Sequence, residues 1–380
     1  MTESPAARPP FSFTVEARDP GSAARAGILH TPHGDVETPT FMAVGTQGTV
    51  KTLTSEQVTA TGTRIVLGNT YHLSMRPGAE AVAELGGLHS FTGWPGPTLT
   101  DSGGFQVYSL EGLREVDDDG VTFQSHFDGT KMRLGPEEAV RLQELIGADI
   151  IMALDECLPY PVERGAAAAS LERTLRWARR CADARTREDQ ALFAVIQGAT
   201  YRDLRLRCAE ELAALDLPGY AIGGLSVGEG PDLMAEVLSY TAPAMPEDRP
   251  RYLMGVGPPE DILAAVEAGV DMFDCVMPTR NARGGGAFTA DGKRHLRRAC
   301  YRDDPGPVEP GCGCYCCRSF SRGYIRHLLN VGEVTGATLL SIHNLSFYAR
   351  FMGEIRDAVA AGDLSGYAKG FRARYRDSAD

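Results

Sequence analysis

Short hydrophobic runs alternate along the chain with amphipathic segments. Eight of these runs are almost continuously apolar, which is typical of parallel strands that are covered on both faces. They lie at 38–45, 63–69, 97–101, 148–155, 191–197, 219–224, 251–256 and 270–274. Helical periodicity occurs between them, at 136–147, 171–185, 201–215 and 258–269. Alternating strands and helices indicate right-handed βαβ units, and eight strands favour a closed barrel over an open sheet. The pattern therefore predicts an α/β fold of the (β/α)8 TIM-barrel type.

Two segments interrupt this alternation. Residues 120–135 are typical of a β-hairpin with Asp128-Gly129 at its turn, inserted after the third strand. Residues 279–346 are rich in glycine, cysteine and basic side chains, and they form a second insertion after the eighth strand. We therefore predict four parts, with a helix at 347–362 closing the barrel. They are a disordered lead at 1–10, a barrel at 11–278, a subdomain at 279–346 and a helical segment at 347–380.

The composition is that of a packed globular protein, with 43% hydrophobic and 23% charged residues among 380. No run reaches the roughly 18 apolar residues of a membrane-spanning helix, and the first ten residues lack the apolar part of a secretory signal. We therefore expect a cytoplasmic protein. The net charge of −12 argues against binding of nucleic acid through the whole surface.

A local basic cluster follows the eighth predicted strand. Residues 280–298 hold six basic side chains against the single Asp291. Such a run is by itself typical of a solvated loop, but its position next to a strand end favours contact with phosphate groups. The six are Arg280, Arg283, Lys293, Arg294, Arg297 and Arg298.

Functional groups stand at the ends of six predicted strands. In a barrel, the carboxyl ends of all strands meet at one mouth, where the active site lies. A single aspartate at such a place is usually a helix cap or a turn residue. Three aspartates that each end an apolar run predict an active site instead. The six strand-end residues are Asp101, Asp155, Gln197, Gly224, Met254 and Asp274.

The segments around these residues resemble tRNA-guanine transglycosylase of the shorter, bacterial type. The resemblance runs from about residue 11 to the last helix. It implies a pentosyltransferase that exchanges guanine at wobble position 34 of tRNA for 7-aminomethyl-7-deazaguanine (preQ1). The substrates would be the tRNAs for aspartate, asparagine, histidine and tyrosine, which have GU(N) anticodons. The exchange is a step in queuosine biosynthesis. The matching motifs are GNTYHLSMRPG (68–78), DSGGFQ (101–106), MALDECLPYP (152–161), VIQG (195–198), AIGGLSVGE (221–229), YLMGVGPPED (252–261) and DMFDCVMPTRNAR (271–283).

The resemblance implies that Asp274 is the nucleophile and Asp101 the general acid/base. A glycosidic bond breaks through an oxocarbenium-like state, which a carboxylate can trap as a covalent ester. The departing purine takes up a proton and the incoming base loses one, so a single acid can serve both halves of a double displacement. Burial beside a second carboxylate would raise the pKa of that acid. No nucleotide-binding motif occurs, in keeping with a base exchange that needs no energy source.

Recognition of the base follows from its donors and acceptors. The N1–H and the exocyclic amine of guanine suit the carboxylate of Asp155, and the O6 carbonyl suits donors from Gln197 and the backbone of Gly224. Phe105 and Met254 are expected to cover the two faces of the base. The predicted base-binding set is completed by Asp101, Ser102, Gly103, Gly104 and Leu225, whose carbonyl would accept the ammonium arm of preQ1.

The resemblance also implies two segments that contact the tRNA anticodon loop. The wobble base is already unpaired there, so flipping it out costs little. The family is typically a homodimer, so a second copy is an expected partner. The two segments are Gly255, Val256, Gly257, Pro258, Pro259, Glu260 and Asp261, and Thr279, Arg280, Asn281, Ala282 and Arg283.

Four of the nine cysteines lie within residues 312–317, which predicts a metal site rather than a disulfide framework. The resemblance implies Cys312, Cys314, Cys317 and His343 as ligands. Three thiolates and one imidazole complete a tetrahedral Zn2+ site with no open position, so its role would be structural. The spacing favours Cys317 over the adjacent Cys316. His327 is a rival to His343, although we expect it on a helix surface.

Three other interpretations stay open at this point. A barrel metallohydrolase would need a catalytic metal at the strand ends, usually beginning with an H-x-H motif. A non-catalytic RNA-binding subunit would be expected to lack Asp274 or Asp101, and both are present. A member of the same family that prefers preQ0 or queuine is the third alternative, and the departures NARGGGAF (281–288) and Ser226 concern the RNA contacts and the pocket for the 7-substituent.

Overall fold

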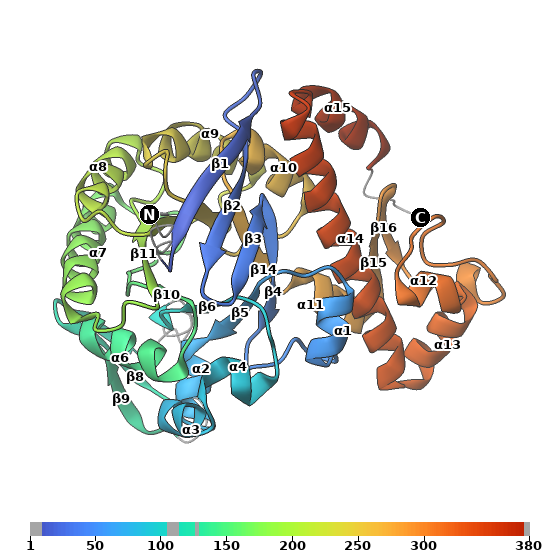
Figure 1. Cartoon of the computed structure of the whole chain (residues 1–380), viewed down its shortest axis with the longest axis horizontal. Coiled ribbons are helices and arrows are strands. Elements are labelled where there is room, and N and C mark those ends of the chain that lie inside the picture. Colours follow the sequence, from blue (N-terminus) through green and yellow to red (C-terminus); the bar gives the residue numbers. More distant parts are fainter. Residues whose placement is uncertain (1–9, 105–113, 126–128, 376–380) are drawn as a thin grey trace, which may run out of the picture.

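The computed structural model of the chain describes residues 10–104, 114–125 and 129–375. It contains a closed barrel of eight parallel strands, so all eight predicted strands are confirmed (Figure 1). Adjacent strands follow one another in chain order, and the last pairs with the first. The strands are β4 (Thr40–Gly45), β5 (Val66–Asn69), β6 (Thr98–Asp101), β10 (Ile150–Met152), β11 (Ala191–Ile196), β12 (Gly219–Ile222), β13 (Arg251–Leu253) and β14 (Met272–Cys275).

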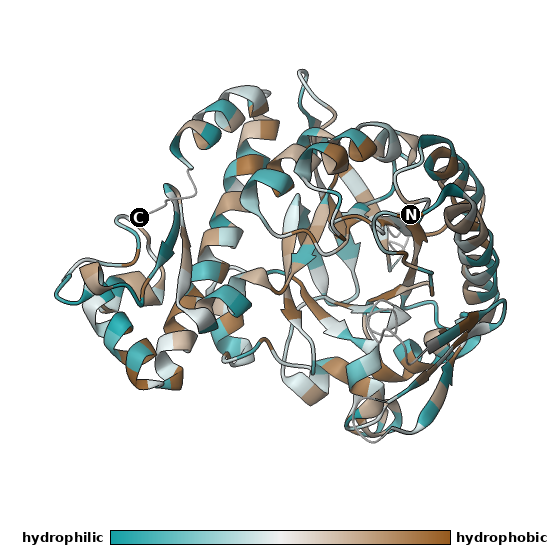
Figure 2. Ribbon diagram, turned by 180° about the vertical axis from the view of Figure 1, so that it is seen from behind, coloured by the Kyte–Doolittle hydropathy of each residue, from teal (hydrophilic) through white to brown (hydrophobic). Residues whose placement is uncertain are grey.

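Helices surround the barrel. Three predicted helices appear as α6 (Pro136–Ile146), α8 (Arg202–Ala213) and α10 (Pro259–Glu267). The helix predicted at 171–185 begins earlier, as α7 (Arg164–Ala184), because its alanine-rich start has high helix propensity. Hydrophobic residues gather along the strands and on helix faces turned toward them (Figure 2). The other elements of this layer are α1 (Ser55–Ala60), α2 (Thr70–Met75), α3 (Ala79–Glu84), α4 (Gly87–Thr92), α9 (Pro231–Thr241) and the 3-10 turn η1 (Ala242–Ala244).

An antiparallel sheet that the sequence analysis missed closes the amino-terminal end of the barrel. It consists of β1 (Ser12–Arg18), β2 (Arg25–Thr31) and β3 (Gly34–Thr38). Leu29 and Val36 of this sheet are buried in the same hydrophobic cluster as residues that fill the barrel interior. The sheet therefore plugs one end, and the strand carboxyl ends lie at the other.

The predicted hairpin at 120–135 is present and has a third strand. β8 (Gly120–Gln124) pairs with β9 (Lys131–Leu134), and β7 (Arg114–Asp117) pairs with the other edge of β8. Asp128, predicted at the turn, lies outside the described residues. Gly129 has a φ of +74°, a backbone conformation that favours glycine.

The region after β14 forms a unit with its own hydrophobic cluster, which includes Leu296, Ile325 and Leu340. The boundary predicted between residues 346 and 347 falls inside one long helix, α14, which packs against both this unit and the barrel strand β4 (Figure 1). Within the described residues, no helix has the length and apolar character needed to cross a membrane. The elements are α11 (Met277–Gly284), β15 (Gly286–Thr289), β16 (Gly292–His295), η2 (Ala299–Tyr301), α12 (Tyr315–Ser319), α13 (Arg322–Val331), α14 (Val334–Ala360) and α15 (Leu364–Arg374).

Candidate active site

Asp101 ends β6 at the barrel mouth and is half-buried. Its carboxylate accepts hydrogen bonds from Asn69 Nδ2 (2.5 Å), the Thr70 N–H (3.0 Å) and the Gly103 N–H (3.2 Å). Burial raises the pKa of Asp101 to about 7, against the effect of these three bonds, and the nearby charge of Asp274 adds to the rise. A carboxyl group with a pKa near neutrality can both donate and accept a proton under physiological conditions.

Asp274 is held at one of its two carboxylate oxygens. The Tyr252 hydroxyl (2.6 Å) and the Gly255 N–H (2.7 Å) both donate to Oδ1. Burial raises the pKa of Asp274, and these two bonds limit the rise. Burial and the charge of Asp274 raise the pKa of Tyr252 well above its ordinary value, so its hydroxyl remains a donor. Among the described residues nothing donates to Oδ2, which is the oxygen left to bond a substrate.

The two carboxylates face the same mouth from different parts of the barrel wall. Asp101 lies on β6 and Asp274 on β14, with β4 and β5 between them. They are close enough that the charge of Asp274 raises the pKa of Asp101. The expected convergence of strand ends therefore holds for this pair. One carboxylate has an open oxygen and the other titrates near neutrality, which suits a nucleophile and a proton carrier.

Asp155 and Gln197 form a second polar pair at the mouth. Gln197 Nε2 donates to Asp155 Oδ2 at 2.7 Å, and burial raises the pKa of Asp155 to about 6. Gly224 lies against this pair with a φ of +64°, and a Cβ there would come within 2.4 Å of Gln197 Oε1. Glycine is thus required at this position both for the backbone conformation and for the close approach.

The loop after β12 presents its backbone in a defined orientation. Glu229 accepts hydrogen bonds from the N–H groups of Ser226 and Val227, the latter at 2.9 Å. Because the C=O and N–H of a trans peptide point in opposite directions, the Leu225 carbonyl points away from Glu229. The orientation matches the acceptor role predicted for this carbonyl.

Three remaining members of the predicted base-binding set directly follow Asp101 in the chain. Ser102 is buried, Gly103 has a φ of +83°, and a Cβ on Gly104 would lie 3.1 Å from the Asp155 carbonyl oxygen. Met254 follows β13 and is half-buried. Phe105 lies outside the described residues, so its predicted place over the base stays a prediction.

The predicted metal ligands form one buried group. His343 Nδ1 lies 3.8 Å from Cys312 Sγ, 3.7 Å from Cys314 Sγ and 3.3 Å from Cys317 Sγ. Bond lengths of about 2.3 Å to sulfur and 2.0–2.1 Å to nitrogen give tetrahedral edges of about 3.6 Å, so these spacings fit one Zn2+-sized ion. His343 Nε2 lies 2.7 Å from the Phe288 carbonyl, which fixes a proton there and leaves Nδ1 as the ligand.

Neither rival ligand belongs to this group. Cys316 is fully buried beside it, but the four atoms within 4.8 Å of one another come from Cys312, Cys314, Cys317 and His343. His327 lies exposed on α13, as expected. The geometry therefore selects the predicted set.

Comparison with known proteins places this arrangement in a family. A family model described as queuine tRNA-ribosyltransferase matches residues 19–377. The chain belongs to the queuine tRNA-ribosyltransferase family. Proteins of that name are similar to it over nearly its whole length. That of Pelotomaculum thermopropionicum is 55% identical over 365 residues, covering 96% of this chain and 99% of the relative. That of Symbiobacterium thermophilum is 57% identical over 359 residues (94% and 90%).

Membership of the queuine tRNA-ribosyltransferase family decides against the barrel metallohydrolase. One further group near the other barrel end has metal-ligating side chains, namely His33, His89 and Asp149. The two imidazole rings are stacked with centroids 3.6 Å apart and an angle of 15°, and each donates a ring N–H to its own Asp149 oxygen. Because parallel stacked rings cannot both aim a lone pair at one ion, this group is a hydrogen-bonded cluster.

Each of the two predicted RNA-binding segments contains exposed, half-buried and buried residues. Glu260 and Arg280 are exposed, and Asn281 and Arg283 are half-buried on α11. Pro258 and Asp261 are half-buried, and Gly255 donates its N–H to Asp274. Those with buried side chains or backbone are Val256, Gly257, Pro259, Thr279 and Ala282.

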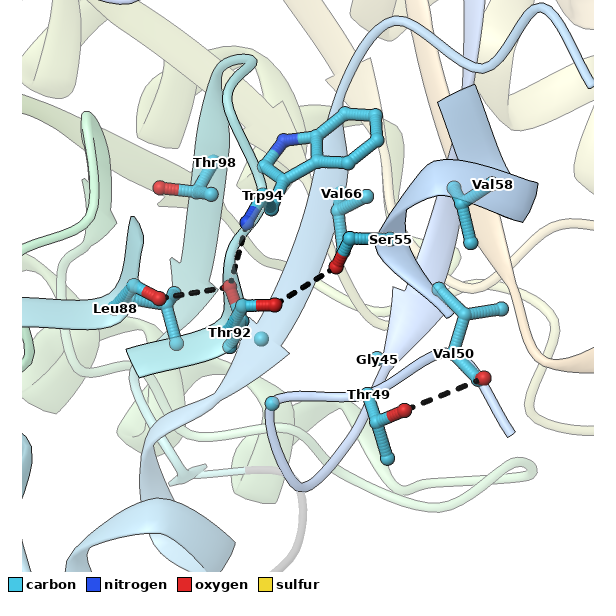
Figure 3. Close-up of a pocket in the computed structure, with 12 residues that line it drawn as sticks. Gly45, Thr49, Val50, Ser55, Val58, Val66, Leu88, Thr92, Trp94 and Thr98 are labelled. Atoms are coloured by element: carbon cyan, nitrogen blue, oxygen red, sulfur yellow. Dashed lines mark hydrogen bonds between the residues drawn. The ribbon is translucent and has the colours of Figure 1, made fainter. Parts of the chain in front are cut away.

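A cavity with a volume of about 30 Å3 lies between the connection after β4, strand β5 and helix α4 (Figure 3). Thr92 lies at its wall, where its carbonyl accepts from Ser55 (2.8 Å) and its hydroxyl donates to the Leu88 carbonyl (2.8 Å). This volume holds one or two water molecules and is too small for a purine. It is therefore a feature of packing and not a base site.

Sequence reasoning missed four residues of this site. Asn69 could have been found, because it ends a predicted strand and precedes Thr70 as a helix cap would. Tyr252 lies inside an apolar run and carries no local signal. Arg205 and Glu229, which bind the loops after β11 and β12, show their role only once the fold brings them there.

Proposed function

We propose that this protein is a tRNA-guanine transglycosylase that exchanges guanine 34 of tRNAs with GU(N) anticodons for preQ1. The exchange runs by double displacement through a covalent ester between Asp274 and the ribose, in the cytoplasm where tRNA is modified. Family membership supports ribosyl transfer on tRNA as the reaction class. The observation that carries the proposal is the pair of aspartates at the mouth. Asp274 accepts hydrogen bonds at Oδ1 and leaves Oδ2 free for a substrate. Asp101 lies across the mouth from it and has a pKa of about 7.

In the first displacement, Asp274 Oδ2 attacks C1′ of the ribose, and the C1′–N9 bond of guanine 34 breaks. The bonding electrons leave with the purine, and Asp101 donates a proton to it. The hydrogen bonds from Tyr252 and Gly255 keep Asp274 ionised and aimed, although burial opposes its ionisation. The product is neutral guanine and a ribosyl ester.

The second displacement reverses these steps with a different base. The N9 proton of preQ1 passes to the Asp101 carboxylate, and N9 attacks C1′. The C1′–O bond of the ester breaks, which regenerates the Asp274 carboxylate. One proton has been given and one returned, so Asp101 ends the cycle in the state in which it began.

The loop after β12 supports preQ1 as the incoming base. The Leu225 carbonyl points away from Glu229, so it is available as an acceptor for the ammonium arm of preQ1. The nitrile of preQ0 is only an acceptor and would need a donor at this place. Queuine carries an ammonium group but adds a bulky ring, so it remains the alternative that an assay must test.

The same edge of guanine and of preQ1 suits Asp155, Gln197 and Gly224. Asp155 keeps lone pairs for N1–H and the amine while it accepts from Gln197. Gln197 has a second N–H, and the Gly224 N–H adds another donor for O6. We therefore propose that the base-binding residues and the RNA-binding segments expected from the sequence have those roles.

Zn2+ is the metal that best suits the cluster of Cys312, Cys314, Cys317 and His343. When bound, the ion would supply a cross-link and no chemistry, since four protein ligands leave no open position. The cluster joins α12 to α14, and through the Phe288 carbonyl to β15. This cross-link would support α11 and the basic β15–β16 hairpin, which would contact the anticodon loop beside Asp274.

A homodimer is the assembly we propose. Four exposed apolar side chains lie on α12, α13 and the start of α14, on the unit that carries the metal cluster. An exposed apolar surface of this kind is typical of a protein interface. The four are Tyr315, Tyr324, Val331 and Val334. Sedimentation of the full chain should give twice the chain mass, and a monomer at micromolar concentration would contradict this assembly.

The test of the reaction is incubation with unmodified tRNA(Tyr) and each candidate base, followed by nucleoside analysis. We expect preQ1 at position 34 with release of one guanine per tRNA. Incorporation of preQ0 or queuine in preference to preQ1 would overturn the choice of base. Absence of any exchange, including exchange of labelled guanine, would overturn the function.

A further inference from the structure

A fully buried arginine without a carboxylate partner lies behind the base-reading loops. Arg205 belongs to α8, and its side chain is 0% exposed. Within the described residues, no acidic side chain forms an ion pair with it. Its guanidinium donates to four backbone carbonyls instead, those of Ala199 (2.7 Å), Ile196 (3.0 Å), Gly223 (2.8 Å) and Gly224 (3.4 Å).

These carbonyls belong to two separate loops. Ile196 and Ala199 flank Gln197 at the end of β11, and Gly223 and Gly224 follow β12. The loops therefore share one rigid planar donor that comes from the outer helix layer. Both loops carry groups proposed to read the O6 edge of the base, the Gln197 amide and the Gly224 N–H.

Each hydrogen bond from Arg205 fixes the orientation of the peptide group that contains the accepting carbonyl. The Gly223 carbonyl points at Arg205, so the N–H of Gly224 in the same trans peptide points away from it and from the outer helix layer. The Gly224 carbonyl points the same way, so the Leu225 N–H also faces away from Arg205. Within the described residues, neither N–H has a hydrogen-bond partner. The loop thus offers two donors where the O6 acceptor is expected.

Burying an arginine without a counter-ion is costly, and burial lowers the pKa of Arg205 to about 10. The group stays protonated at neutral pH, so it can hold all four carbonyls. The loops it holds contain non-glycine residues with unusual backbone, with φ of +51° at Ala199 and +59° at Ser226. Such conformations persist only where surrounding contacts stabilise them.

We propose that Arg205 is a positioning residue that sets the selectivity for a 6-oxopurine by holding the Gly224 N–H toward O6 of the bound base. The inference rests on the proposed base exchange. It assigns Arg205 no contact with the base itself. It predicts that losing the guanidinium weakens the binding of bases with oxygen at C6, while the contacts with tRNA are preserved.

The experiment compares Arg205→Met, Arg205→Lys and the wild type in exchange of labelled guanine into tRNA. We expect the KM for guanine to rise about tenfold in Arg205→Met, as for loss of one buried hydrogen bond, with the KM for tRNA within twofold. Arg205→Lys keeps the charge but lacks the planar fork, so its KM for guanine should lie between the other two. Inhibition by 2-aminopurine, which has no oxygen at C6, should change less than twofold.

The matched control is Arg251→Met. Arg251 is also buried, donates to the carbonyls of Met245 (3.0 Å) and Gly269 (3.4 Å), and lies at the start of β13, away from the mouth. Its loss should lower the melting temperature without changing either KM. If Arg205→Met fails to fold, Arg205→Lys carries the test, and a KM for guanine at least threefold above wild type supports the inference.

The outcomes separate this inference from the function on which it rests. Wild-type protein that incorporates no guanine refutes the base exchange. Normal wild-type exchange with an unchanged KM for guanine in the folded Arg205 variants refutes the role of Arg205 alone. An equal loss of affinity for guanine and 2-aminopurine also refutes it, because that result indicates general loss of the site.

Discussion

Removing the hydroxyl group of Tyr252 should slow formation of the covalent intermediate in a pH-dependent way. The hydroxyl donates to Asp274 Oδ1 at 2.6 Å, and Tyr252→Phe leaves only the Gly255 N–H on that oxygen. A hydrogen bond to a charged group contributes about 1.5–3 kcal/mol, and one pKa unit corresponds to about 1.4 kcal/mol. The pKa of Asp274, already raised by burial, should therefore rise by a further 1–2 units or so.

Only the ionised Asp274 carboxylate can attack C1′. The acidic limb of the pH–rate profile should therefore move to higher pH by the same number of units. At a pH below both pKa values, the variant should form the adduct about 10- to 100-fold more slowly. At a pH above both values the difference should shrink. The assay is rapid quenching of enzyme with labelled tRNA, followed by a denaturing gel that resolves the adduct, at a series of pH values.

Tyr220→Phe is the matched control for this experiment. Tyr220 is a buried tyrosine on the neighbouring strand β12, but its hydroxyl accepts from the Leu217 N–H at the other end of the strand. It should leave the pH profile unchanged. If Tyr252→Phe forms the adduct at the wild-type rate across the pH series, the reasoning about Oδ1 is refuted.

Three further predictions concern the metal, the acid and the base pocket. Cys317→Ser should release one Zn2+ per chain and lower the melting temperature, whereas Cys316→Ser should retain the metal; equal retention in both would contradict the ligand set. Because folded Asp101 titrates at about 7, the folded state holds a proton that the unfolded chain loses near pH 3.8, so wild-type stability should fall as pH rises through this window. Asp155, whose pKa is also raised, contributes a slope of the same sign, so Asp101→Asn should remove only the share of Asp101, about 2–4 kcal/mol between pH 4 and 8 in urea unfolding, and an unchanged slope would argue against a raised pKa. Gly224→Ala should raise the KM for guanine at least tenfold, because its Cβ would meet Gln197 Oε1 at 2.4 Å, and an unchanged KM would place the base elsewhere.

The barrel and its strand-end chemistry follow from the sequence because both depend on local patterns. Apolar runs mark strands, and aspartates that end them, such as Asp101 and Asp274, meet at the mouth by topology alone. The sheet β1–β3 was missed even though FSFTVEA (11–17) alternates apolar and polar residues, because that weaker alternating signal lies outside the continuous apolar runs that mark the barrel strands.

The supporting residues could not be predicted in this way, since their partners are distant in sequence. Tyr252 reads as one more apolar position in a strand, and its partner Asp274 is 22 residues away. Arg205 reads as a charged residue on an amphipathic helix, where exposure is the ordinary expectation. Its burial against four carbonyls follows from the docking of α8 on β11, beside the loop that follows β12. The backbone groups at Gly224 and Leu225 likewise depend on the tertiary contacts that orient them.

The most direct test of the account is the identity of the residue that bonds to the ribose. Wild-type protein should be incubated with tRNA(Tyr) while released guanine is removed, then digested and analysed by peptide mass spectrometry. The account predicts a ribosyl adduct on Asp274 and no adduct in Asp274→Asn, which should also exchange no labelled guanine. An adduct on another residue, or guanine exchange by Asp274→Asn at a rate near that of the wild type, would contradict it.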